Sequence, residues 1–168
     1  WKTDSGIDFV IRPIRPEDES LVVDFHGRLS NETVYQRYFT KLGYEQRVAH
    51  ERLVRVCFTD YDREIALVAE RLDPETDKLC IASIARLIRL HNSNTAEFSL
   101  IVADDYQGHG LGTEMIRRLI EVGREEALDR MVAEILGANG GMVRICEELG
   151  FTITADEEGD TLNAELVL

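Results

Sequence analysis

The sequence predicts an α/β fold of the α+β type, in which helices flank a mixed, mostly antiparallel sheet of seven strands. Apolar residues recur at helical spacing through most of the first third of the chain, and the pattern becomes extended beyond Thr59. Two long extended segments, 65–72 and 79–90, flank the turn-rich connection 73–78, as in an antiparallel hairpin. The chain has 168 residues, is 44% hydrophobic and 30% charged, and is expected to form a single domain over residues 1–168.

The remaining elements follow from the same periodicities and from capping residues. Before the hairpin we expect a strand at 7–14, a helix opened by Pro16, a helix capped by Ser30 or Asn31 and ending at Phe39, and a helix at 45–58. After it we expect a strand at 95–102, a helix behind the glycine-rich segment 107–112, a strand at 131–136, a short helix at 140–149, and a closing hairpin of 151–155 and 161–168 around Glu157-Glu158-Gly159-Asp160.

Composition excludes several classes of function. The formal net charge of −13 argues against nonspecific nucleic-acid binding, which requires basic surface to displace counterions from phosphates. No apolar run approaches the roughly 20 residues that cross a bilayer, so we expect no membrane partner and a cytoplasmic chain. Cys57, Cys80 and Cys146 have neither CxxC nor His/Cys spacing, which predicts reduced, mostly buried thiols and no metal site.

The segment Gln107-Gly108-His109-Gly110-Leu111-Gly112 lies between an apolar strand and an amphipathic helix. Glycines remove side chains from the path of an approaching anion, and a helix that begins at once aims its free N–H groups and dipole at that anion. The backbone amides from Gln107 to Thr113 and the Thr113 hydroxyl are therefore candidate donors to a pyrophosphate. The other interpretation is a tight strand-to-helix connection without a ligand.

Two other nucleotide-binding motifs do not fit this segment. The dinucleotide fingerprint requires a third glycine where Thr113 stands and a parallel βαβ context, whereas an antiparallel hairpin precedes the segment here. A P-loop requires Gly-Lys followed by Ser or Thr, a combination that the sequence lacks.

These residues resemble the GNAT superfamily of N-acetyltransferases, whose signature is Gln or Arg, two residues, Gly, one residue, then Gly or Ala. Gln107, Gly110 and Gly112 match it. The resemblance covers nearly the whole chain, including splayed fourth and fifth strands, and it implies an acyl-CoA N-acyltransferase fold. Further matching residues are Asn139, Met142 and Leu149-Gly150-Phe151.

The segment 28–39, Arg-Leu-Ser-Asn-Glu-Thr-Val-Tyr-Gln-Arg-Tyr-Phe, is similar to the acetyltransferase part of bacterial protein lysine acetyltransferases. Those enzymes often fuse this domain to a regulatory module. The N-terminus at Trp1, without an initiator Met, agrees with excision from such a longer protein.

The resemblance implies acetyl-CoA as cosubstrate, with its pantetheine arm along the fourth strand as an extra β-partner. It implicates Leu100, Ile101 and Val102 through backbone groups, and a backbone N–H near Val102 as donor to the oxyanion formed during attack. Asn139 is a second cofactor contact or, equally, a helix N-cap. The expected cofactor-binding residues are Leu100, Ile101, Val102, Gln107, Gly108, His109, Gly110, Leu111, Gly112, Thr113 and Asn139.

Acetyl transfer requires a neutral amine, and a lysine of pKa near 10.4 is neutral only about once in 2,500 molecules at pH 7. Glu97 is the candidate general base. In an extended strand Glu97 and Ser99 project to one face while Phe98 and Leu100 project to the other. Strand position alone favours an ordinary solvent-facing glutamate, but a Glu at this place is the usual base of related lysine acetyltransferases.

Several neighbouring residues are expected to have minor or structural roles. Cys146 stands where many relatives have a Tyr that protonates the departing thiolate, and a packed thiol is the favoured interpretation over a weak acid. Tyr106 is expected to pack, His109 to touch phosphate or to face solvent, and Asp104 and Asp105 to point away from the diphosphate.

The resulting hypothesis is an N-acetyltransferase that acts on a protein lysine by direct attack in a ternary complex with acetyl-CoA. A small-molecule amine acetyltransferase and a noncatalytic acyl-CoA-sensing module are the alternatives.

Overall fold

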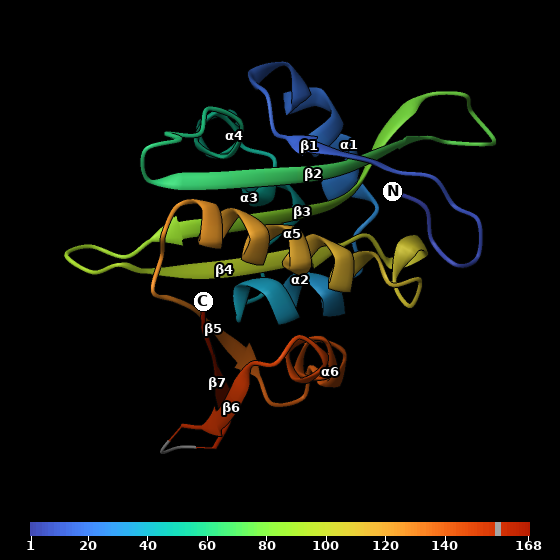
Figure 1. The fold of residues 1–168 in the computed structure, drawn as a ribbon. Coiled ribbons are helices and arrows are strands. Elements are labelled where there is room, and N and C mark those ends of the chain that lie inside the picture. Colours follow the sequence, from blue (N-terminus) through green and yellow to red (C-terminus); the bar gives the residue numbers. More distant parts are fainter. Residues whose placement is uncertain (157–158) are drawn as a thin grey trace.

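The computed structural model describes residues 1–156 and 159–168. The described residues form a seven-stranded sheet in the order β1-β2-β3-β4-β5-β7-β6 (Figure 1). Its strands are β1 Val10–Pro13, β2 Glu64–Leu72, β3 Leu79–Arg89, β4 Thr95–Val102, β5 Arg130–Leu136, β6 Thr152–Ala155 and β7 Thr161–Val167. The helices are η1 Pro16–Asp18, α1 Glu19–Gly27, α2 Asn31–Tyr38, α3 Tyr44–Arg47, α4 His50–Cys57, η2 Asp104–Tyr106, α5 Leu111–Glu125 and α6 Gly140–Glu148.

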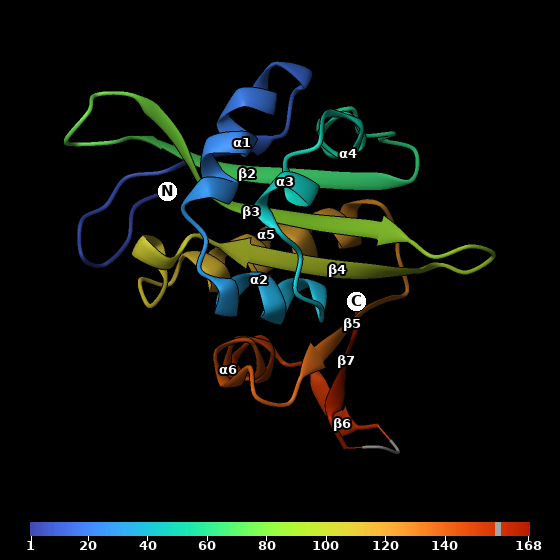
Figure 2. The same ribbon diagram turned by 180° about the vertical axis from the view of Figure 1, so that it is seen from behind.

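The sheet is mixed, as predicted: β4 and β5 are parallel, and all the other pairs are antiparallel. Helix α5 covers one face of β3 and β4, and α1 to α4 cover the other face (Figure 2). The apolar side of α5 supplies part of the core, with Met115, Ile116 and Leu119 fully buried. None of the helices that the structure describes is both long and apolar enough to cross a bilayer.

Two predicted elements differ from the structure. The helix expected at 45–58 is two helices, α3 and α4, because Ala49 between them has extended backbone dihedrals and serves as the N-cap of α4. The buried Arg47 at the end of α3 donates to the carbonyl of His26 at 2.9 Å, which holds α3 against α1. The strand expected at 7–14 is shorter, since residues 1–9 fold back on themselves and Phe9 donates to the carbonyl of Trp1.

The predicted closing hairpin is present as β6 and β7, which pair antiparallel. Residues 157 and 158 of its expected connection lie outside the described part of the chain.

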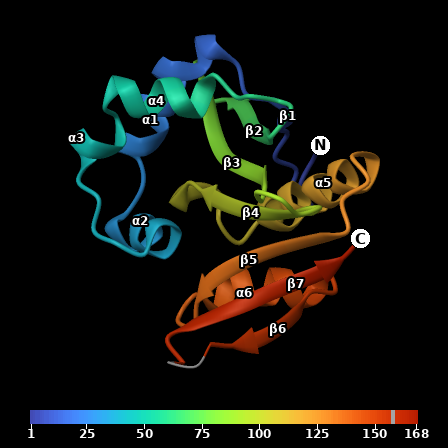
Figure 3. The same cartoon turned by 90° about the vertical axis from the view of Figure 1, so that its left-hand side faces the viewer.

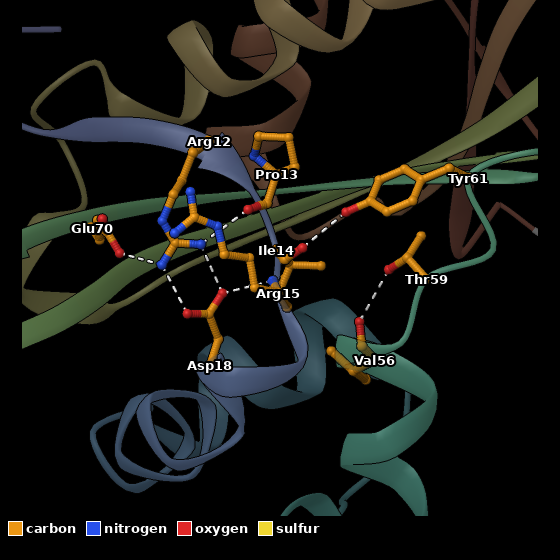
Figure 4. Close-up of polar contacts among 9 residues, drawn as sticks. All are labelled: Arg12, Pro13, Ile14, Arg15, Asp18, Val56, Thr59, Tyr61 and Glu70. Carbon is orange, nitrogen blue, oxygen red and sulfur yellow. Dashed lines mark hydrogen bonds and ion pairs between the residues drawn. The ribbon is translucent and has the colours of Figure 1, made fainter.

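A buried ion pair ties the first strand to the rest of the sheet (Figure 4). Arg12 donates from both terminal nitrogens to the carboxylate of Asp18 at 2.8 Å, and it also donates to Glu70 on β2. Burial disfavours the charge of Asp18, but the hydrogen bonds from Arg12 and Arg15 outweigh burial and lower its pKa. This contact fixes the corner where the chain turns from β1 into η1 and α1.

The centre of the sheet opens between β4 and β5. The two strands are paired only from Thr95 to Glu97 on β4, opposite Arg130 to Val132 on β5, and they diverge beyond that point (Figure 3). The splayed fourth and fifth strands expected from the resemblance are therefore present. Their divergence leaves the second half of β4 paired with β3 alone.

Candidate active site

A cleft of about 740 Å³ lies where β4 and β5 diverge. It is lined by the C-terminal half of α2, by β4, by the glycine segment, by β5 and by α6. The predicted site residues that line it are Glu97, Leu100, Ile101, Val102, Gln107, Gly108, Gly110, Gly112, Thr113 and Asn139. The cleft thus has one end at the glycine segment and another at Glu97, beside the end of α2.

The glycine segment has the geometry of an anion-binding turn. Gly108 and Gly110 have φ of +75° and +80°, a region that residues with side chains rarely adopt, and Gly110 is the N-cap of α5. Gly112 permits close approach of the helix, because a Cβ there would lie 2.9 Å from Ile145 Cδ1 and 3.2 Å from Leu100 Cδ2. Because Gly110, Gly112 and Thr113 line the cleft, the N-terminus of the 15-residue helix α5, with its amides and dipole, lies at the cleft.

Two residues of this segment point elsewhere. The Leu111 side chain is buried in the core, so Leu111 can reach the cleft only through its backbone. The His109 ring lies toward the N-terminal segment, with Nδ1 at 3.4 Å from the Ser5 hydroxyl. Neither residue lines the cleft.

Gln107 stabilises the glycine segment through hydrogen bonds to α2 and β4. Its side-chain nitrogen donates to the Thr33 hydroxyl and to the Val102 carbonyl, both at 3.0 Å, and its backbone N–H donates to the Asp104 carbonyl at 3.2 Å. The backbone amide predicted as a pyrophosphate donor is thus already engaged. Gln107 lines the cleft and holds its shape.

Helix α2 is fastened to the same region by side chains of the segment 28–39. Ser30 caps the helix by accepting from the Thr33 amide, and the Ser30 amide and the Thr33 hydroxyl both donate to Asp104 at 3.0 Å. The Asp104 carboxylate is therefore engaged by the start of α2. Burial opposes its charge, but these hydrogen bonds lower its pKa.

Glu97 is exposed and lines the cleft, whereas Phe98 and Leu100 are buried on the opposite side of β4. The predicted alternation is confirmed. Ser99, on the same side as Glu97, accepts a hydrogen bond of 2.8 Å from the Arg37 guanidinium.

The backbone of β4 presents alternate residues to the gap. Leu90 donates to the Thr95 carbonyl and Ala103 donates to the Ala82 carbonyl, so odd-numbered residues of β4 face β3. Leu100 and Val102 consequently turn their backbone groups to the gap, where the predicted oxyanion donor lies. Ile101 lines the cleft, but its carbonyl faces β3 and accepts from the Ser83 hydroxyl at 2.9 Å. The backbone role predicted for Ile101 does not match this orientation.

The family model described as an acetyltransferase (GNAT) domain matches residues 8–152, most of the chain. The chain belongs to the GNAT acetyltransferases. It is an acetyl-CoA-dependent acetyltransferase, as the resemblance implied.

Individual relatives agree with this assignment. Acetyltransferase PA5475 of Pseudomonas aeruginosa is 33% identical to this GNAT chain over 158 residues, which cover 94% of the chain and 82% of that protein. Acetyltransferase Pat of Mycolicibacterium smegmatis is 29% identical over 156 residues, and the chain spans 44% of its length. The crystal structure of the GNAT domain of S. lividans PAT superimposes with a TM-score of 0.88 at 23% identity, covering 100% of this chain and 95% of that one, and it shows the same fold.

Cys146 of this GNAT domain is a packed thiol. It is fully buried in α6 and does not line the cleft. Burial, with a smaller effect of Glu147, raises its pKa to about 12, so it is a poorer acid than an exposed thiol. The favoured interpretation from the sequence is confirmed.

Tyr106 and Asn139 have structural contacts. Tyr106 is buried and meets the Phe9 ring edge-on, at 5.5 Å between centroids. The Asn139 carboxamide oxygen accepts from the Met142 amide at 3.1 Å and caps α6. Because Asn139 also lines the cleft, the cofactor contact expected for it remains a prediction.

Some residues of the cleft have no role in the sequence-based prediction. Arg37 and Tyr38 of α2, Glu134 of β5, and Arg144 and Glu148 of α6 all line it. For α2 a signal was available, because Ser30, Thr33 and Arg37 are spaced three and four residues apart and so share one face of the helix.

Proposed function

We propose that this GNAT acetyltransferase transfers the acetyl group of acetyl-CoA to the side-chain amine of a lysine in a protein, with Glu97 as general base. The observation that carries the proposal is the exposed Glu97 carboxylate in the cleft, on the strand that runs to the glycine segment. The similarity to acetyltransferase Pat and the resemblance of segment 28–39 to bacterial protein lysine acetyltransferases support a protein lysine as acceptor.

The proposed reaction is a direct transfer in a ternary complex. The amine lone pair attacks the thioester carbonyl carbon, its proton passes to Glu97 directly or through a water, and the developing oxyanion accepts from the Val102 N–H. Collapse of this intermediate breaks the carbon–sulfur bond and releases the coenzyme thiolate. Water protonates the thiolate, since Cys146 is buried away from the cleft.

The cleft is suited to a cationic side chain. Glu97, Glu134 and Glu148 line it, and the cations that line it are Arg37 and Arg144. The net charge of −13 also favours a basic protein surface as partner. The fused regulatory module and the cytoplasmic location expected from the sequence stay predictions.

The test is incubation of candidate protein substrates with labelled acetyl-CoA, followed by mass-spectrometric localisation of the acetyl group, for the wild type and Glu97→Gln. We expect modified lysines with the wild type and a fall in kcat of roughly 10²- to 10⁴-fold in the variant near neutral pH. Glu121→Gln, an exposed carboxylate lost from α5, is the matched control and should retain the wild-type rate.

A measurement of acetyl-CoA binding distinguishes a loss of catalysis from a loss of folding in the variant. Trp1 is the single tryptophan of the sequence and lies about 4.0 Å from the position of a Cβ on Gly110, so its fluorescence should report occupation of the glycine segment equally in wild type and Glu97→Gln. Undiminished acetylation by Glu97→Gln would show that Glu97 is not the base. Transfer to free amines alone would show that the acceptor is a small molecule.

A further inference from the structure

An arginine cluster, Arg37, Arg52 and Arg86, lies beside the end of the cleft that holds Glu97, and one of its members reaches the cleft. The guanidinium groups of Arg37 and Arg52 lie over the Tyr38 ring, at 5.0 Å and 4.9 Å from its centroid. Arg86 on β3 is close enough to Arg37 to lower its pKa by charge repulsion. Of these cations, Arg37 lines the cleft.

Arg37 has no anionic partner in the described part of the chain. Arg86 is paired with Glu64, but none of the ion pairs found among residues 1–156 and 159–168 includes Arg37 or Arg52. The protein carries 32 acidic residues against 19 Lys and Arg, so unpaired guanidinium groups at a cleft are unexpected. The hydrogen bond that Arg37 donates goes to the neutral Ser99 hydroxyl.

The environment of Arg37 favours an added anion. Burial lowers its pKa first, and the nearby Arg86 and Arg52 lower it further, while Tyr38 and Glu97 act in the opposite direction. A guanidinium nevertheless keeps its proton, and its planar fork matches the two oxygens of a carboxylate. An arriving carboxylate would therefore accept the charge-assisted hydrogen bonds that the partly desolvated Arg37 guanidinium no longer donates to water.

We propose that Arg37 binds a carboxylate of the acceptor, so that lysines with an aspartate or glutamate two positions away are the preferred substrates. This inference rests on the proposed function. Arg37 contacts Ser99, which lies on the same face of β4 as Glu97 and roughly 7 Å along it. An extended peptide covers about the same distance in two residues. A lysine amine at Glu97 and a carboxylate two positions away in the same peptide at Arg37 are therefore geometrically compatible.

The test uses pairs of lysine peptides that differ only by Glu or Gln two positions from the lysine. With the wild-type chain we expect kcat/KM to be roughly tenfold to a hundredfold higher for the Glu peptide, the usual effect of one charge-assisted hydrogen bond. Arg37→Met should remove this preference, and Arg37→Glu should reverse it in favour of a peptide with Arg two positions from the lysine. Far-ultraviolet circular dichroism confirms that each variant is folded.

Two control variants distinguish direct binding of the carboxylate by Arg37 from a structural role of Arg37 in holding α2. Ser99→Ala removes the hydrogen bond to Arg37 but keeps its charge, and it should keep the preference for the Glu peptide. Arg55→Gln removes an exposed arginine of α4 that does not line the cleft, and it should keep the preference as well. A loss of preference in Ser99→Ala equal to that in Arg37→Met would overturn direct binding by Arg37 and indicate that it only holds α2.

The outcomes distinguish this inference from the proposed function. Equal kcat/KM of the wild type for Glu and Gln peptides would overturn the carboxylate site while leaving lysine acetylation intact. Acetyl-CoA binding without acetylation of any peptide or protein would overturn the proposed function. Free amino acids are tested beside the peptides: their acetylation alone, lost in Arg37→Met, would support the carboxylate site and overturn the peptide acceptor.

Discussion

For Cys146, burial of the thiol argues directly against a role in catalysis. Because it is fully buried and its pKa is raised to about 12, removing it should leave chemistry unchanged. We expect Cys146→Ala to retain the wild-type kcat and to lose roughly 1 to 2 kcal/mol of folding free energy from the cavity it creates. Steady-state rates and urea unfolding measure the two effects. A large loss of kcat in a variant that remains folded would make Cys146 the proton donor.

Individual residues also show how far sequence reasoning reaches. Alternation along one strand places Glu97 and Phe98 on opposite sides, and the structure agrees. The contacts of Gln107 and His109 were not predictable, because their partners Thr33 and Ser5 lie 74 and 104 positions away in the chain. The spacing of residues within a motif predicts the local backbone conformation. It does not predict which distant segments pack against that motif.

At the level of elements, α2 and the glycine segment form one unit through the Thr33 hydroxyl, which accepts from Gln107 and donates to Asp104. We expect Thr33→Val, similar in shape but without the hydroxyl, to lower the free energy of unfolding by roughly 1 to 3 kcal/mol, because the buried Thr33 loses two hydrogen bonds. The KM for acetyl-CoA should rise, since Gln107 then loses one of its two side-chain supports.

The control for this variant is Glu32→Gln, an exposed change on the same helix. Urea unfolding and initial rates at varied acetyl-CoA concentration measure both effects. An unchanged KM in Thr33→Val would mean that α2 and the glycine segment are independent.

Element boundaries were predictable where one local pattern sets them. The bounds of β4 agree with the prediction because its apolar alternation is flanked by turn residues. The break between α3 and α4 was missed, because it depends on Arg47 reaching the carbonyl of His26 on another helix. A helical periodicity continues through Val48 whether or not the chain turns there.

At the level of the whole molecule, His26 links stability to pH. It is 3% exposed, and burial, with the nearby Arg47, Arg52 and Arg37, lowers its pKa from 6.5 to about 4. As pH falls from 6.5 to 4, His26 therefore becomes protonated in the unfolded chain but stays neutral in the folded chain. The contribution of neutral His26 to the free energy of unfolding is fully present above pH 6.5. It is lost as pH falls from 6.5 to 4, by roughly 3 kcal/mol in total.

Urea unfolding at pH 7.5 and pH 5.0 tests this prediction. His26→Gln should reduce the loss of stability between the two pH values, whereas His91→Gln, which removes an exposed histidine, should leave it unchanged. An equal acid-induced loss in His26→Gln and in the wild type would assign the effect to other groups.

The divergence of β4 from β5 has a cost that reaches beyond catalysis. It creates a free strand edge inside a sheet, where the backbone groups of Leu100 and the N–H of Val102 face the gap, while the Val102 carbonyl is held by Gln107. On the placement predicted from the resemblance, the pantetheine arm of acetyl-CoA would cover this edge, and acetyl-CoA at a hundredfold excess over its Kd would stabilise the folded protein by about 2.7 kcal/mol. On that placement, the resistance of the folded enzyme to aggregation and proteolysis would rise and fall with the concentration of its own cosubstrate.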